Sequence, residues 1–184
     1  TCTACAVGKY STASNVAQCT ACPASKFADA EGSSKAEDCK ACAAGSVTNT
    51  GSVAGASLCT ACAVGKYSSR SDVDACTSCV AGQYASTSGL TGCSECAAGK
   101  KQAVDGMAFC DACEAGKYQT STAATKCNDC TTGYYSGALA TACKLCADGK
   151  HSGTRASVCN DCPKGYYGLS NGTCTTKCTA GKYS

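Results

Sequence analysis

The sequence has very few of the residues that fill a conventional protein core. Among its 184 residues there is no isoleucine or tryptophan, and only two phenylalanines, five leucines and nine valines. Although 44% of the residues count as hydrophobic, 33 of these are alanine and 22 are cysteine, and alanine buries little apolar area. A chain of this composition is not expected to fold without cross-links. The composition therefore excludes an ordinary globular core.

Charge and hydropathy exclude two further classes. The net charge is only +3 and 16% of the residues are charged, so we expect no nucleic-acid partner. No apolar run approaches the roughly 18 residues that a membrane-spanning helix requires. We therefore expect no membrane span in this segment.

Cysteine is the residue that the chain has in excess, at 22 of 184 residues. This abundance is typical of disulfide scaffolds in exported proteins. Serine and threonine number 21 each, and Asn171-Gly172-Thr173 is an acceptor sequence for N-linked sugar. We therefore predict an extracellular or cell-surface glycoprotein that is glycosylated at Asn171 and whose Ser/Thr-rich loops offer acceptors for O-linked sugars.

The cysteines belong to a short repeat that fills the chain. Ten Cys-x-x-Cys pairs are followed by an eleventh pair, Cys174 and Cys178, with three residues between its members. We predict one continuous array over residues 1–184, with repeats starting at Cys2, Cys19, Cys39, Cys59, Cys76, Cys93, Cys110, Cys127, Cys143, Cys159 and Cys174.

Three further positions recur in each repeat. The residue three places after the second cysteine is glycine in ten of eleven repeats, with Ser25 as the exception. The next position is lysine in seven repeats, and the one after that is Tyr or Phe in eight. We expect the glycine to have a positive φ or to allow close backbone approach. We expect the aromatic ring to supply the largest apolar surface of the repeat.

The repeat predicts a fold of small disulfide-rich modules with little or no helix. The Gly-Lys-Tyr-Ser segment and the residues before the next cysteine are expected to form short strands of β-hairpins, separated by turns. Each repeat is expected to touch only its neighbours, as in other solenoid-like arrays. The whole array is therefore expected to be an extended rod.

Spacing alone leaves the disulfide pairing open. A bridge within Cys-x-x-Cys closes a strained ring, and a ladder that joins first to first and second to second cysteine leaves one of eleven pairs unmatched. We favour a ladder in which the second cysteine of one pair joins the first of the next, leaving Cys2 and Cys178 for neighbouring repeats. Its bridges are Cys5–Cys19, Cys22–Cys39, Cys42–Cys59, Cys62–Cys76, Cys79–Cys93, Cys96–Cys110, Cys113–Cys127, Cys130–Cys143, Cys146–Cys159 and Cys162–Cys174.

The repeat Cys-x-x-Cys-x-x-Gly-Lys-Tyr-Ser resembles the cysteine-rich repeat found beside EGF-like modules in ephrin-receptor-like ectodomains. It is also similar to modules of tumour-necrosis-factor receptors and to cysteine-rich surface antigens of ciliates and other protists. Residues 159–168, with the sequence CNDCPKGYYG, lie closest to the usual pattern. The resemblance implies an extracellular disulfide-rich fold. The Ala-, Ser- and Thr-rich array looks more like a protist coat or fibre protein than a vertebrate receptor.

Other chemistry is weighed against this interpretation. Successive Cys-x-x-Cys pairs could bind zinc, but eleven pairs leave one pair unmatched. Zinc knuckles also usually place a glycine directly beside the second cysteine, whereas here the glycine lies three residues after it. A redox Cys-x-x-Cys requires a helix N-terminus in a βαβ fold, which the pattern lacks. His151 occupies the aromatic position of its repeat, where it replaces tyrosine. We therefore predict no enzyme activity, no metal site and no cofactor.

The sequence favours a structural role. We predict an extracellular structural protein that forms part of a surface coat, appendage or filament. Because both ends lie inside a repeat, we expect head-to-tail self-association or continuation along a longer chain. The alternative is a receptor or adhesin ectodomain that binds a protein or glycan. The recurring lysines are either a solvated edge or a basic stripe for anionic partners.

Overall fold

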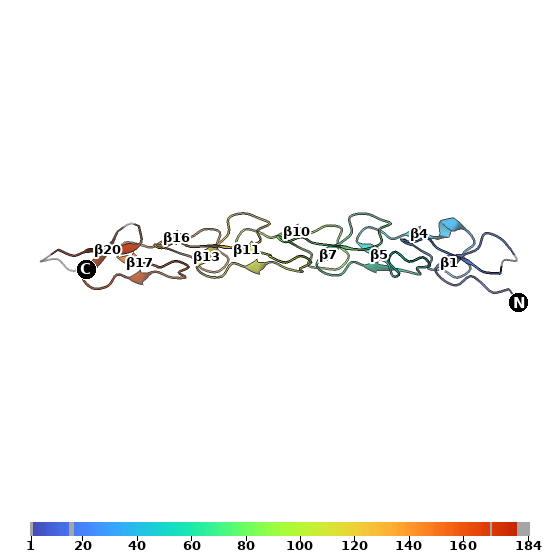
Figure 1. Ribbon diagram of the computed structural model, residues 1–184, viewed down its shortest axis with the longest axis horizontal. Helices are drawn as coiled ribbons and strands as arrows, with labels where there is room; N and C mark the ends of the chain where they lie inside the picture. Colours follow the sequence, from blue (N-terminus) through green and yellow to red (C-terminus); the bar gives the residue numbers. More distant parts are fainter. Residues whose placement is uncertain (1, 15–16, 170, 180–184) are drawn as a thin grey trace. The chain divides into compact units, whose positions relative to one another are not determined.

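The computed structural model describes residues 2–14, 17–169 and 171–179, and it consists of short strands joined by turns (Figure 1). Its strands form ten two-stranded sheets, and the paired strands follow each other directly in the sequence. The pairs are β1 (Lys9–Tyr10) with β2 (Thr20–Ala21), β3 (Lys26–Phe27) with β4 (Lys40–Ala41), β5 (Ser46–Thr48) with β6 (Cys59–Ala61), β7 (Lys66–Tyr67) with β8 (Thr77–Ser78), β9 (Gln83–Tyr84) with β10 (Ser94–Glu95), β11 (Lys100–Lys101) with β12 (Asp111–Ala112), β13 (Lys117–Tyr118) with β14 (Asn128–Asp129), β15 (Tyr134–Tyr135) with β16 (Lys144–Leu145), β17 (Lys150–His151) with β18 (Asn160–Asp161), and β19 (Tyr166–Leu169) with β20 (Thr173–Lys177).

A single turn of 3-10 helix, Ala36–Asp38, is the only helical element among the described residues. The prediction of disulfide-stapled hairpins with little or no helix is therefore confirmed.

The second strand of each hairpin lies at a different place from the one predicted. It includes the residues between the two cysteines of a pair, as in β2, where Lys9 pairs with Ala21 and Tyr10 with Thr20. The hydrogen bonding between the two strands continues beyond β2, where the amide of Cys22 donates to Gly8 O at 2.8 Å. Hydrogen bonds to the first strand of the hairpin therefore fix the Cys-x-x-Cys segment, and disulfides fix its two ends.

The chain divides into two compact units with interleaved boundaries. The first comprises Thr1–Val80, Tyr84–Ser94 and Asp105–Ala108, and the second Ala81–Gln83, Glu95–Val104 and Phe109–Ser184. Both units are built from the same hairpin. A single continuous array over all 184 residues stays a prediction.

The buried positions of the repeat are small. The second cysteine of nine pairs is buried, and so is the residue that follows the aromatic position in nine repeats. These nine residues are Ala28, Thr48, Ser68, Ala85, Gln102, Gln119, Ser136, Ser152 and Gly168. The core of each repeat is therefore made of sulfur and one small or polar residue.

The aromatic residues differ in how far they are enclosed. Tyr10 is partly buried and packs against the cluster of Cys22, Ala28 and Cys39, whereas Tyr167 keeps 43% of its surface exposed. The Tyr10 ring thus packs against the bridge Cys22–Cys39 and its neighbour Ala28.

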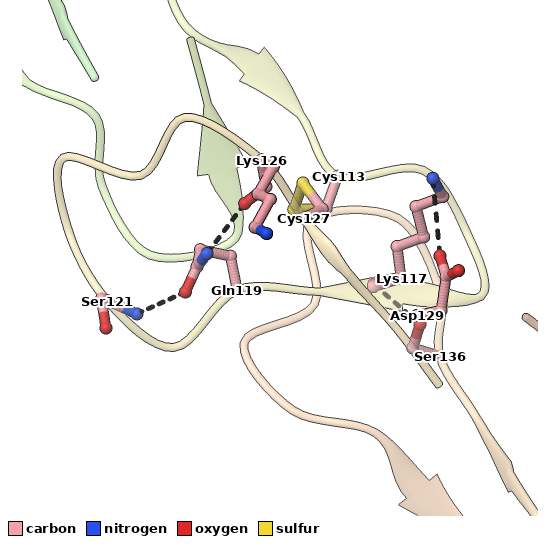
Figure 2. The surroundings of a disulfide bond; sticks show 8 residues. All are labelled: Cys113, Lys117, Gln119, Ser121, Lys126, Cys127, Asp129 and Ser136. Atoms are coloured by element: carbon pink, nitrogen blue, oxygen red, sulfur yellow. Dashed lines mark hydrogen bonds and ion pairs between the residues drawn. A yellow bond between two sulfur atoms is a disulfide. The ribbon is translucent and has the colours of Figure 1, made fainter. Parts of the chain in front are cut away.

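Polar side chains in the interior are satisfied by backbone groups. The hydroxyl of Ser136 donates to Lys117 O at 2.9 Å, and Gln119 donates through Nε2 to Lys126 O at 2.8 Å. Gln119 Oε1 also accepts from the amide of Ser121 at 3.0 Å (Figure 2). No buried side-chain nitrogen or oxygen lacks a partner among the described residues. These side chains fix the loops between the cysteines without a large apolar core.

Candidate functional site

The structure contains ten disulfides, and they are the ten pairs of the ladder favoured above. They join Cys5–Cys19, Cys22–Cys39, Cys42–Cys59, Cys62–Cys76, Cys79–Cys93, Cys96–Cys110, Cys113–Cys127, Cys130–Cys143, Cys146–Cys159 and Cys162–Cys174. Their sequence separations lie between 12 and 17 residues. Cys2 and Cys178 are not in disulfides; Cys2 is exposed and Cys178 is half-buried.

The disulfides use the sulfur atoms that a zinc site would require as thiolates. Within the part of the chain that the structure describes, no group of three or more His, Cys, Asp or Glu side chains could hold a metal ion. The described residues also include no helix long and apolar enough to cross a bilayer.

The recurring glycine is the point at which the repeats approach each other most closely. Gly8 has a φ of +78°, and a Cβ built on it would lie 2.2 Å from Gly55 O. Its amide donates to Ala28 O at 2.8 Å. Both reasons predicted for this glycine, a positive φ and close backbone approach, are therefore confirmed. The same contact joins Gly45 to Gly89, Gly65 to Gly106, Gly82 to Ala123, Gly99 to Leu139, Gly116 to Arg155 and Gly133 to Asn171.

The residue opposite most of these glycines is a second left-handed position that the sequence pattern does not reveal. It lies four residues before the first cysteine of the following pair, and its amide donates to the carbonyl of a second cysteine, as Gly55 does to Cys22 O at 2.8 Å. The residues at this position, all with positive φ, are Gly55, Asp72, Gly89, Gly106, Ala123, Leu139 and Arg155. Only three of the seven are glycine, so the sequence carries a weak signal.

We call this arrangement the glycine interlock, meaning the recurring glycine together with the residue whose carbonyl covers it. It corrects the expectation that each repeat touches only its neighbours. Gly8 lies in the repeat that starts at Cys2, and Gly55 in the one that starts at Cys39, two repeats further on. The contact is possible because the interior residues between them are small.

Ser25 interrupts the interlock. It adopts a φ of 64° although it has a Cβ. By the register of the other repeats Asp72 lies opposite, and its amide is 3.4 Å from Cys42 O. The equivalent bonds elsewhere measure between 2.7 and 2.9 Å. The extra side chain therefore coincides with a looser contact.

Replacing Ser25 by glycine is expected to stabilise the protein by up to about 1 kcal/mol, because the left-handed conformation then carries no Cβ penalty, and the bond lost from Ser25 Oγ to Asp74 Oδ1 is exposed. The midpoint of denaturant unfolding without reductant and the exchange rate of the Asp72 amide would measure the effect. Ser69→Gly is the control, since Ser69 is exposed and does not have a positive φ. Equal or lower stability of Ser25→Gly compared with Ser69→Gly would contradict the prediction.

The recurring lysine faces the residue before the second cysteine across each hairpin. Lys9, Lys26, Lys66 and Lys100 are exposed. Two others have an acidic partner: Lys117 Nζ lies 3.5 Å from Asp129 Oδ1, and Lys150 Nζ lies 2.6 Å from Asp161 Oδ1. The lysines of the second compact unit are thus partly neutralised, and a stripe for anionic partners stays a prediction.

The Lys150–Asp161 pair also makes one titration depend on folding. The hydrogen bond from Lys150, together with the charge of its ammonium group, holds the pKa of Asp161 below its usual value. Because folding lowers this pKa, the contribution to stability is present above the ordinary aspartate pKa. It is lost as the pH falls through the lowered pKa. Asp161 is fully exposed, so the contribution is small.

His151 and Asn171 lie in the second compact unit. His151 is half-buried, pairs with Asn160 across its hairpin and lines a groove of 390 Å³ with Tyr166 and Pro163. The structure therefore places it where a tyrosine stands in other repeats. Asn171 is exposed in the turn between β19 and β20. Its glycosylation stays a prediction.

The comparisons with known proteins agree with this geometry. No curated protein matches the chain. Residues 1–39 match the family described as tyrosine-protein kinase ephrin type A/B receptor-like, over the first two Cys-x-x-Cys pairs and the first cysteine of the third. The many disulfides and this match are typical of secreted or extracellular domains. The N-terminal segment of the chain is therefore similar to the ephrin-receptor-like cysteine-rich repeat, and tandem stapled hairpins continue beyond it.

Proposed function

We propose that the chain is an extracellular structural protein that forms part of a cell-surface coat, appendage or filament. The observation that carries the proposal is the glycine interlock together with the disulfide ladder. Both recur with nearly constant spacing and use backbone atoms and sulfur, so the loop side chains are free to vary. The proposal assigns the chain no catalytic activity. A repeated element that depends on geometry more than on side-chain identity suits a scaffold.

The path of covalent bonds supports a mechanical role. Tension that enters at Cys19 passes through Thr20 and Ala21 to Cys22, and then crosses the bridge to Cys39. Three backbone steps span about 11 Å at most, and the bridge adds 5.6 Å between Cα atoms. This repeat can thus extend to roughly 16 Å, whereas the 20 backbone steps from Cys19 to Cys39 would reach about 70 Å without the bridge. The hairpin loops lie outside the path that bears the load.

We propose that Cys2 and Cys178 join such elements head to tail, either with another copy or with repeats along a longer chain. Cys2 is the first cysteine of its pair and Cys178 the second. A bridge between them would have the same order as the ten bridges within the chain. Both thiols lie outside the disulfides, and Cys2 is exposed.

The match of residues 1–39 to an ephrin-receptor-like family favours a second candidate, a receptor or adhesin ectodomain. In that case a face of the repeats would bind a protein or glycan, and the ladder would only hold the face in place. The exposed lysines of the first compact unit, Lys9, Lys26 and Lys66, are candidate contacts with an anionic ligand.

Imaging of native material tests the proposal. An antibody against the chain is expected to label ordered filaments or a continuous coat in electron micrographs. Non-reducing gels of the same material are expected to show covalent oligomers that dithiothreitol dissolves, unless the repeats continue in one longer chain. Single labelled molecules that are each bound to a distinct partner would overturn the structural proposal and support the receptor.

A further inference from the structure

The turn between β19 and β20 carries the sequence Asn171-Gly172-Thr173, and two of its residues have a structural explanation. Asn-Gly is a preferred pair in tight hairpin turns. Gly172 has a φ of +69°, and a Cβ built on it would lie 2.2 Å from Gly133 O. The carbonyl of Asn171 covers Gly133 in the glycine interlock. Thr173 has no role in this contact.

Thr173 is directed at the side chain of Asn171. Its hydroxyl donates to Asn171 Oδ1 at 2.8 Å, and its amide donates to the same oxygen at 3.2 Å. Both donors bond to the carboxamide oxygen, so Nδ2 is the atom of this side chain that remains available for modification. Asn171 itself is exposed.

We propose that Asn171 is a site of N-linked glycosylation in which the folded turn presents Nδ2 to solvent. The donor would be a lipid-linked oligosaccharyl pyrophosphate. Nδ2 forms a bond to C1 of the first sugar, the bond from C1 to the pyrophosphate oxygen breaks, and one amide proton is lost as the lipid pyrophosphate leaves. The carboxamide oxygen takes no part in this reaction, so the two hydrogen bonds that Thr173 donates to it remain in the glycosylated protein.

The glycan would have a fixed point of attachment. The backbone on which it stands is held by the contact of Asn171 O with Gly133, and Gly172 O accepts from the amide of Ser152 at 3.4 Å. Sugar attached to Nδ2 does not compete with either contact. The modification is therefore expected to leave the fold and its stability nearly unchanged.

The inference requires export from the cell but does not depend on the structural role. The experiment expresses the full chain behind a secretory leader in a eukaryotic host, as wild type and as Asn171→Gln, Thr173→Ala, Thr173→Ser and Asn160→Gln. Asn160 is exposed and is followed two residues later by the bridged Cys162 and not by serine or threonine, so it provides the matched control. Glycopeptide mass spectrometry and treatment with peptide N-glycosidase read out the site directly on the wild type.

Wild type, Thr173→Ser and Asn160→Gln are expected to carry a glycan whose removal leaves aspartate at position 171. Asn171→Gln and Thr173→Ala are expected to lack it. Secreted wild type with intact disulfides and an unmodified Asn171 would overturn the inference while leaving the extracellular assignment in place. If a variant fails to be secreted, the glycopeptide map of the wild type still decides the question.

Discussion

The Gly65→Ala substitution is expected to lower the free energy of unfolding by about 3 kcal/mol or more. Gly65 has a φ of +78°, and a residue with a Cβ costs roughly 1–2 kcal/mol in this left-handed conformation. The new Cβ would lie 1.9 Å from Gly106 O, so the two backbones must separate. Separation disturbs the bond from the Gly106 amide to Cys79 O, now 2.7 Å long, and that from Gly65 to Ala85 O. Each such bond contributes about 1 kcal/mol.

Amide hydrogen exchange under oxidising conditions is the measurement for this substitution. Protection of the Gly106 amide is expected to fall about a hundredfold, because each 1.4 kcal/mol corresponds to a factor of ten. Gly92→Ala is the matched control within the same compact unit. Gly92 does not have a positive φ and has no heavy atom within 4 Å of a built Cβ. Similar exchange rates in the two variants would show that the interlock contributes nothing.

Complete reduction is expected to unfold the protein in buffer without denaturant. In the chain-entropy model each bridge over a loop of about 14 residues contributes about 3 kcal/mol. Ten such bridges together exceed the net stability of roughly 5–15 kcal/mol that folded domains possess. The buried interior, which consists mainly of cysteine, alanine and small polar residues, cannot replace them.

Circular dichroism and hydrogen exchange of the reduced and alkylated chain would test this expectation. Loss of the slowly exchanging hairpin amides is the predicted result. The oxidised chain at the same pH and temperature serves as the control. Retention of amide protection after alkylation of all 22 cysteines would mean that backbone packing, not sulfur, holds the fold.

The predictable parts of the fold are those that depend on residues with a strong conformational preference. The paired cysteines favoured the ladder over two alternative pairings, and the glycine three residues after each pair indicated a positive φ or close backbone approach. Ser25 shows the limit of that rule, since the chain keeps a φ of 64° there without glycine. The backbone path is therefore imposed by the neighbouring repeats and not by the residue itself.

The parts that were missed depend on contacts between distant residues. Leu139 and Arg155 adopt a positive φ because their carbonyls cover Gly99 and Gly116, and nothing in their side chains reveals it. Gln102 and Gln119 look like surface residues in the sequence, yet both are buried and bonded to loop carbonyls. Their burial follows from the loop that wraps them. A pattern of hydrophobicity could not have found them.

The connectivity of the bridges also determines what a peptidase can achieve. Most of the chain lies in loops that begin and end at bonded cysteines, such as residues 6–18 between Cys5 and Cys19. Hydrolysis of one peptide bond in such a loop leaves both fragments joined through sulfur. Between Cys5 and Cys174, only a cut inside a Cys-x-x-Cys segment divides the molecule, and the two residues between its cysteines lie in a hairpin strand. Nicked molecules would therefore accumulate without falling apart, so a surface layer built from them would age by damage to loops while staying whole.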